Sequence, residues 1–160
     1  MRDGAVVRCA APTSAYGEPD DTGIGGFLGS PPTNVLIGMV GHDGADLRLD
    51  LGGHSVPVPA SRASRAGGSV ALGIRPGPAT IEKAVTATTA DTTATVRGTL
   101  QRSEPSGSAV SPTTEVCGQT VGSQAPAAFR TEPSAESRLR IPAGQCRWYD
   151  PETGLLLEVL

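Results

Sequence analysis

The sequence predicts a mainly β fold, either a barrel or a sandwich, on three observations. Of the 160 residues, 21 are Gly and 14 are Pro, and both residue types interrupt helices and favour turns. Runs in which apolar and polar residues alternate recur between these turns, which is the pattern of half-buried strands. Aromatic residues make up only 3% of the chain, so short aliphatic strands are expected to supply most of the core. The length corresponds to one ordinary domain with at most a short appendage.

The first 30 residues carry mixed signals. The turn-forming residues 3–4 are followed by apolar residues 5–7, which predicts a short strand. Pro12 opens a short helical turn that reaches Tyr16. Each Gly in a helix costs about 1 kcal/mol relative to Ala, so the glycines within residues 17–29 argue against any further helix.

Two apolar runs predict buried strands. Residues 35–40 follow a rigid connection at residues 30–32, which we interpret as a domain boundary. Residues 70–74 alternate and end at the turn-forming residues 75–78. These segments are expected to lie at the centre of the fold.

A hairpin is predicted between these two strands. Residues 47–51 and 54–58 flank a Gly52-Gly53 turn, and apolar residues occupy every second position on both sides. Pro57 cannot donate a hydrogen bond to a neighbouring strand, so the second arm is expected at the edge of its sheet.

The second half of the chain is harder to interpret. Residues 81–100 are rich in Thr, Ala and Val, which favours strands without fixing their register. Residues 101–137 are dominated by Ser, Pro, Gly, Thr and Ala, which predicts long loops or partial disorder. Residues 139–159 predict closing strands interrupted by a turn at residues 150–154, with Trp148 as the largest contribution to the core.

Composition and motifs argue against several activities. The net charge is −3 and the basic residues are scattered, so a nucleic-acid partner is not expected. Lys83 is the only lysine and no glycine-rich loop precedes it, so the chain alone is not expected to hydrolyse ATP. The glycine-rich residues 23–29 lack the preceding strand and the following acidic residue of a dinucleotide-binding loop.

The sequence offers no convincing metal or thiol site. His42 and Asp43 with Asp46 are the nearest approach to a ligand cluster, but this spacing in a glycine-containing segment is typical of a solvated turn. The three cysteines at positions 9, 117 and 146 lie far apart, which predicts reduced thiols in the cytoplasm. No signal peptide or membrane span is apparent in the sequence.

Three stretches of the chain, residues 1–36, 71–77 and 138–157, carry a more specific signal. They include MRDG, GFLGSPPTN, GIRPG and WYDPETG. In this order and spacing they resemble the C-terminal part of the ATP-binding subunits of ABC importers of the maltose and glycerol-phosphate type. The chain departs from that family at Gly77, where a glutamate is usual, and at residues 8–11, where the usual Gln and Gly are absent.

The resemblance implies a two-part layout. Residues 1–32 would be the end of a nucleotide-binding domain, and residues 33–160 an OB-like antiparallel barrel of the TOBE type. All catalytic motifs of the family would lie upstream of Met1, which suggests a truncated gene, a misassigned start or a fragment. The positions that match family motifs, expected to be structural, are Gly29, Ser30, Pro31, Asn34, Arg75, Pro76, Asp150, Thr153 and Gly154.

The family also implies a role and partners. The chain would be a cytoplasmic regulatory domain that forms a homodimer, joins a transporter complex or binds a regulatory protein, and it would meet the membrane only through transporter subunits. No cofactor is expected; ATP and magnesium would be involved only if a nucleotide-binding domain lies upstream.

Two alternatives remain open at the sequence level. In the first, the barrel binds small oxyanions, as related barrels in molybdate-responsive proteins do, with hydroxyls from the Thr-rich residues 86–99. In the second, the chain is a fragment of a full ATPase that energises sugar uptake.

Overall fold

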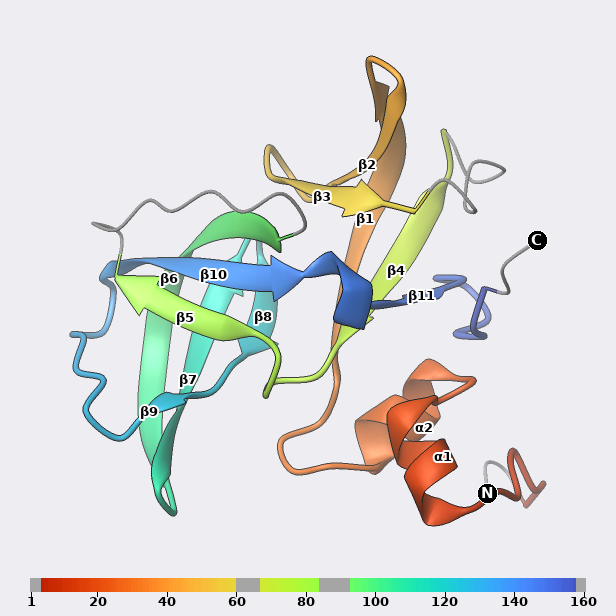
Figure 1. The fold of residues 1–160 in the computed structure, drawn as a ribbon, viewed down its shortest axis with the longest axis horizontal. Coiled ribbons are helices and arrows are strands. Elements are labelled where there is room, and N and C mark those ends of the chain that lie inside the picture. The colour runs from red at the N-terminus through yellow and green to blue at the C-terminus, as the bar shows by residue number, and fades with distance from the viewer. Residues whose placement is uncertain (1–3, 60–66, 84–92, 158–160) are drawn as a thin grey trace.

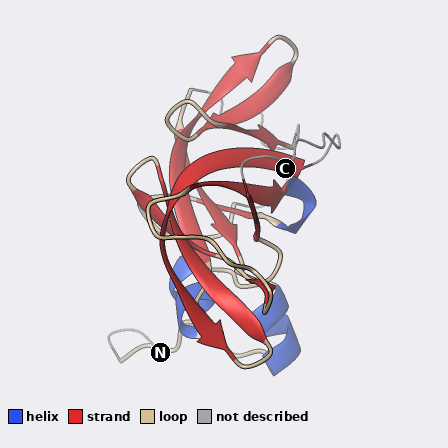
Figure 2. Ribbon diagram, turned by 90° about the vertical axis from the view of Figure 1, so that its left-hand side faces the viewer, coloured by secondary structure: helices blue, strands red, loops and turns tan. Residues whose placement is uncertain are grey.

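The computed structural model describes residues 4–59, 67–83 and 93–157, and within them the chain folds into two antiparallel sheets with short helices near the N-terminus (Figures 1 and 2). The mainly β prediction is therefore confirmed, in the form of an OB-like antiparallel barrel.

The first sheet contains the strands that the sequence predicted most clearly. Its order is β11-β4-β1-β2-β3. The predicted hairpin is present, with Leu49 opposite Val56 across the two arms, and its second arm lies at the sheet edge as Pro57 required. The strands are β1 (Asn34–Asp43), β2 (Asp46–Asp50), β3 (Ser55–Val58), β4 (Ser69–Ile74) and β11 (Arg147–Tyr149).

The second sheet contains the strands expected within residues 81–100 and near residue 139, but it also occupies residues 101–126, for which loops were predicted, and there that prediction is wrong. Its order is β5-β10-β6-β7-β8, and β9 pairs with β7 beside this path. Its strands are β5 (Thr80–Lys83), β6 (Thr93–Ser106), β7 (Ala109–Val116), β8 (Gln119–Gly122), β9 (Ala125–Pro126) and β10 (Glu136–Pro142).

Turn chemistry explains why this polar region forms strands. Cys117 and Gly118 connect β7 to β8 with φ angles of 49° and 76°, the double positive φ that suits a two-residue hairpin. Gly107 provides a φ of 61° in the preceding hairpin. Along β7, buried positions alternate with more exposed ones, as they do in a strand with one face toward the core. Small Ser and Thr side chains can occupy these positions without adding bulk.

The N-terminal region differs from expectation in two places. The helix α1 (Pro12–Gly17) is present as predicted, but a second helix, α2 (Thr22–Phe27), also forms despite its glycines. The carboxylate of Asp21 explains it, because this side chain accepts hydrogen bonds from the backbone N–H groups at the start of α2. The strand expected at residues 5–7 is wrong, since only Ala5 forms an isolated bridge.

The C-terminal prediction is confirmed in part. The strands β10 and β11 form, with the short 3-10 helix η2 (Ala143–Gln145) between them. Beyond them, residues 155 and 156 form two isolated bridges, to Asp21 and to Tyr149, in place of a further strand. Residues 158–160 lie outside the described part of the chain.

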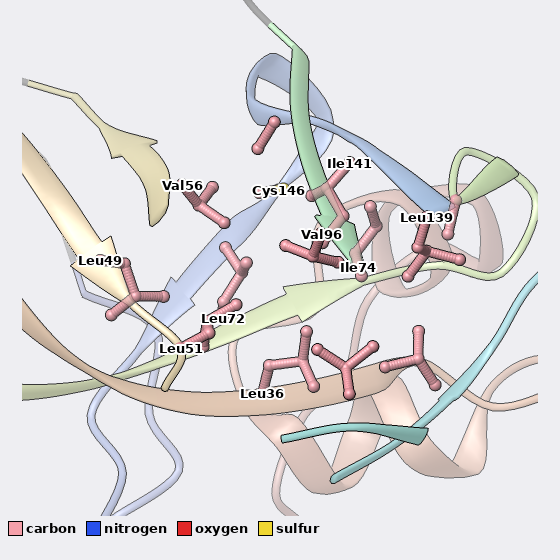
Figure 3. Close-up of a cluster of buried hydrophobic side chains, with 14 of the residues drawn as sticks. Leu36, Leu49, Leu51, Val56, Leu72, Ile74, Val96, Leu139, Ile141 and Cys146 are labelled. Atoms are coloured by element: carbon pink, nitrogen blue, oxygen red, sulfur yellow. The ribbon is translucent and has the colours of Figure 1, made fainter. Parts of the chain in front are cut away.

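A single hydrophobic core joins the two sheets. Leu36, Leu49 and Leu72 of the first sheet and Val96, Leu139 and Ile141 of the second are each fully buried in one cluster (Figure 3). Trp148 is 4% exposed and belongs to this cluster, as predicted. Because both sheets share this cluster, they are expected to unfold together.

Candidate functional site

The three stretches that carry the family resemblance meet at one place in the fold. Residues 16–28, which contain the end of α1 and all of α2, contact Arg75 directly after β4 and residues 147–156 around β11. We call this contact the junction. Figure 1 shows the two helices gathered at the end of the molecule where β11 lies.

Arg75 ties the N-terminal segment to the end of β4. Its guanidinium donates hydrogen bonds to the backbone carbonyls of Tyr16 and Leu28 and lies over the Tyr16 ring, 3.7 Å from the ring centroid. Gly29 has a φ of 123°, and a Cβ atom there would lie 2.7 Å from Nη1 of Arg75. A side chain at position 29 would therefore displace the arginine.

The strand β11 contributes two further contacts. Nη2 of Arg147 donates to the carbonyl of Gly17 at 3.2 Å and lies 3.9 Å from the carboxylate of Glu18. The hydroxyl of Tyr149 donates to the carbonyl of Pro19 at 3.1 Å. The ring of Tyr149 fills the space above Gly73, where an added Cβ would lie 2.5 Å from its Cε2 atom.

The electrostatic surroundings of Tyr149 reflect this packing. Burial raises the pKa of Tyr149 to about 12, because a buried phenolate would lose its hydration. The positive charges of Arg147 and Arg75 oppose this shift, and the carboxylates of Asp21 and Asp20 reinforce it. The phenol therefore lies within electrostatic range of both arginines.

The turn after β11 completes the junction. Oδ1 of Asp150 accepts hydrogen bonds from the backbone N–H groups of Glu152 and Thr153 and from the Thr153 hydroxyl. Gly154 then adopts a φ of 73°, and its carbonyl accepts a 2.9 Å hydrogen bond from the N–H of Thr22 at the start of α2. Gly154 thus contacts the start of α2, while Asp150 and Thr153 shape the turn that leads to it.

A cavity of about 470 Å³ lies within the junction. Its lining includes four of the motif positions, namely Ser30, Pro31, Arg75 and Pro76, together with Arg147 and Tyr149. The peptide bond between Ser30 and Pro31 is cis. Among the described residues that line it are two arginines and two glutamines, and none is Asp, Glu or Lys.

Asn34 has a different role, because it closes the barrel between the two sheets. Its side-chain amide exchanges two hydrogen bonds of 2.7 Å with the backbone N–H and carbonyl of Gly122 in β8. Gln119 does the same in the opposite direction, with bonds of 2.7 and 3.0 Å to the backbone of Ile37 in β1. Sequence patterns carry no signal for Gln119, because its strand lies within residues 101–137, for which loops are predicted.

The remaining candidates from the sequence lie apart from the junction. His42 is exposed near the end of β1, and Asp43 pairs with Arg48 at 3.1 Å. In the described part of the chain, no three His, Cys, Asp or Glu side chains are grouped so that they could hold a metal ion. Of the Thr-rich run, Thr95 and Thr99 are exposed on β6, while residues 84–92 lie outside the described ranges.

The cysteines form no disulfide. Cys9 and Cys117 are exposed, whereas Cys146 is buried, and burial raises the pKa of the Cys146 thiol to about 12. Within the described residues, none of the helices has the length and apolar character needed to cross a membrane.

Comparison with known proteins finds a similarity to one part of import ATP-binding proteins and to a solved structure with the same class of fold. No family model matches the chain. A stretch of 76 residues, 48% of the chain, is 34% identical to the sn-glycerol-3-phosphate import ATP-binding protein UgpC of Escherichia coli O1:K1 and of E. coli K12. It is 33% identical to the same protein of Salmonella choleraesuis. The matched stretch covers only 21% of the length of each relative.

A solved structure supports the fold independently. The cytoplasmic molybdate-binding protein ModG, determined with molybdate bound, superimposes with a TM-score of 0.59 over 74% of this chain and 96% of its own. The sequence identity is 19%, so this likeness concerns the fold. Together the comparisons indicate a barrel fold and a similarity to about a fifth of an import ATP-binding protein, at 21% of its length.

Proposed function

We propose that the chain is a regulatory module of the ATP-binding component of a carbohydrate or polyol-phosphate ABC importer. In this proposal it acts by contact and does not hydrolyse ATP. Residues 1–32 form the docking part and residues 33–160 form the regulatory barrel. The module would work in the cytoplasm and reach the membrane only through the transporter subunits.

The match to import ATP-binding proteins supports this assignment. Those relatives bind ATP, as their names state, but the matched stretch corresponds to about a fifth of their length, at 21%. The sequence of this chain contains no Gly-x-x-x-x-Gly-Lys-Ser/Thr loop, whose backbone N–H groups and lysine would hold the phosphates. A role that depends on contact with an ATP-binding core therefore fits the chain better than hydrolysis.

The observation that carries the docking role is an apolar surface on the N-terminal segment. Phe27 is 85% exposed, and Val6 and Val7 are 67% and 40% exposed. Phe27 and Val7 also line a second cavity, of about 360 Å³, between residues 7–15 and α2. Exposed apolar surface of this kind is typical of a protein interface.

Charge and shape favour a protein partner at this surface. The lining of the second cavity carries one charged side chain, Arg8, and that guanidinium already pairs with Asp20 at 2.7 Å. The other lining residues are apolar or Gly. Burial of the Phe27 side chain alone would contribute about 2 to 3 kcal/mol to association.

A binding experiment tests the docking role. The full chain is titrated against the purified nucleotide-binding core of a glycerol-phosphate import ATPase, and complex formation is followed by sedimentation velocity. We expect a complex that Phe27→Ser weakens by about tenfold or more, because an apolar anchor is lost.

Ile37→Ser is the matched control, since Ile37 is 49% exposed but lies on β1. Failure to form a complex, or an equal loss for the two variants, would refute docking through the N-terminal segment. Self-association of the chain that Phe27→Ser abolishes would show that the same surface joins two copies.

A further inference from the structure

The cavity at the junction has the properties of an anion-binding site, and we propose that it binds a small phosphate-type dianion, either inorganic phosphate or the phosphate group of a small sugar phosphate. This inference concerns a ligand and stands independently of the docking role proposed above.

The first support is the charge of the lining. Arg75 and Arg147 both line the cavity, and among the described residues no acidic side chain does. Within the same residues Arg75 makes hydrogen bonds to backbone carbonyls and to no carboxylate, so no described carboxylate neutralises its positive charge. Guanidinium groups bind phosphate oxygens with paired hydrogen bonds, and two of them facing one space favour a doubly charged ligand.

The neighbouring acidic residues do not remove this positive charge. Asp20 pairs with Arg8 at 2.7 Å, and Oδ1 of Asp21 accepts hydrogen bonds from the N–H groups of Gly23 and Ile24. Glu18 lies 3.9 Å from Arg147, but its side chain is 71% exposed, where solvent screens its charge. The acidic groups therefore have other partners or lie in solvent.

The second support is a set of polar groups in the lining that have no partner within the described residues. Gln124 and Gln145 line the cavity, and neither side chain makes a hydrogen bond within the described residues. Both residues are exposed, so their amides are accessible to a ligand. Each amide has both a donor and an acceptor group that could bond the oxygens or hydroxyls of a ligand.

The cavity is large enough to hold a ligand bigger than phosphate. A volume of about 470 Å³ falls within the range of about 300 to 1,000 Å³ that is usual for small-molecule sites. A single tetrahedral oxyanion would fill only part of it. The two glutamine amides could hydrogen-bond the hydroxyl groups of a sugar attached to the phosphate.

Calorimetric titration of the full chain at low ionic strength and pH 7.5 tests the proposal. The probes are inorganic phosphate, ribose 5-phosphate and ribose. We expect both phosphates to bind and ribose to give no heat. Tighter binding of ribose 5-phosphate than of phosphate identifies a sugar phosphate as the ligand class, whereas equal affinity identifies the free anion. Absence of heat from both phosphates would overturn the proposal.

Substitutions locate the site. Arg147→Gln should weaken phosphate binding by about tenfold, because one charge-assisted contact is lost. Arg97→Gln is the matched control: Arg97 lies on β6 with a side chain that is 64% exposed, away from the cavity, and its substitution should leave affinity unchanged. An equal loss for the two variants would mean that binding follows net charge alone, which refutes the site.

A substitution that is expected to strengthen phosphate binding keeps the test informative if Arg147→Gln perturbs the structure of the junction. Glu18→Gln removes the one carboxylate near Arg147 and should strengthen phosphate binding about two- to threefold. Because this side chain is mostly exposed, folding should be preserved. Unchanged or weaker binding in Glu18→Gln would contradict the proposed position of the ligand.

Discussion

At the scale of single residues, a few side chains act as connectors between backbone segments. Arg75 bonds two carbonyls of the N-terminal segment, and the amides of Asn34 and Gln119 replace a backbone ladder between β1 and β8. The sequence suggested Asn34 and Arg75 only through their resemblance to family motifs. Gln119 was missed because it belongs to no recognisable motif. Its role depends on which residues of β1 and β8 lie opposite each other, and only the fold defines that alignment.

Tyr149 provides a test at this scale through the pH dependence of stability. Burial raises the pKa of Tyr149 from 10.0 to about 12, so the folded state holds its proton more tightly than the unfolded chain does. The stabilisation from this group is thus complete below pH 10 and is lost as the pH rises through about 12.

The variant Tyr149→Phe should therefore show a smaller loss of stability between pH 10 and 12 than the native chain. The difference in slope should approach about 1.4 kcal/mol per pH unit, the value for one proton. Urea titrations at a series of pH values give these slopes, and parallel curves for the native chain and Tyr149→Phe would contradict the assignment.

At the scale of elements, sequence patterns were reliable where apolar residues alternate around a clear turn. The hairpin of β2 and β3 and the strand β4 were predicted on that basis, and β1 was predicted from a continuous apolar run. The second half of β6 and the strands β7 and β8 were missed because Ser, Thr, Pro and Gly dominate their composition, and buried positions such as Thr114 are polar. The helix α2 was missed because the cap at Asp21 outweighs the cost of its glycines.

The glycines of α2 give a matched pair of substitutions. Gly26 has no atom within 4 Å of an added Cβ, whereas a Cβ at Gly25 would lie 3.2 Å from Oγ1 of Thr33. Gly26→Ala should raise the free energy of unfolding by about 0.5 to 1 kcal/mol, because Ala favours the helix and restricts the unfolded chain. Gly25→Ala should gain less or destabilise, because the tight contact offsets the helix preference. Thermal unfolding followed by circular dichroism compares them; a greater gain for Gly25→Ala would contradict the packing described for α2.

At the scale of the whole molecule, the residues that match the family motifs lie where distant segments of the chain contact each other. Eight of the nine motif positions lie in the junction or in the turns that lead into it, and Asn34 closes the barrel. This distribution explains why the sequence could suggest the fold and a set of structural residues. It could not predict the cavity, because Arg75, Arg147 and Thr33 come together only when three distant segments pack.

The central claim is that the chain is a contact module without its own ATP hydrolysis. The most direct measurement is phosphate release from ATP with magnesium by the purified chain, alone and with an importer nucleotide-binding core. We expect no release above buffer from the chain alone, and a change in the rate of the core when the chain is added. Magnesium-dependent turnover of ATP by the chain alone would contradict the account.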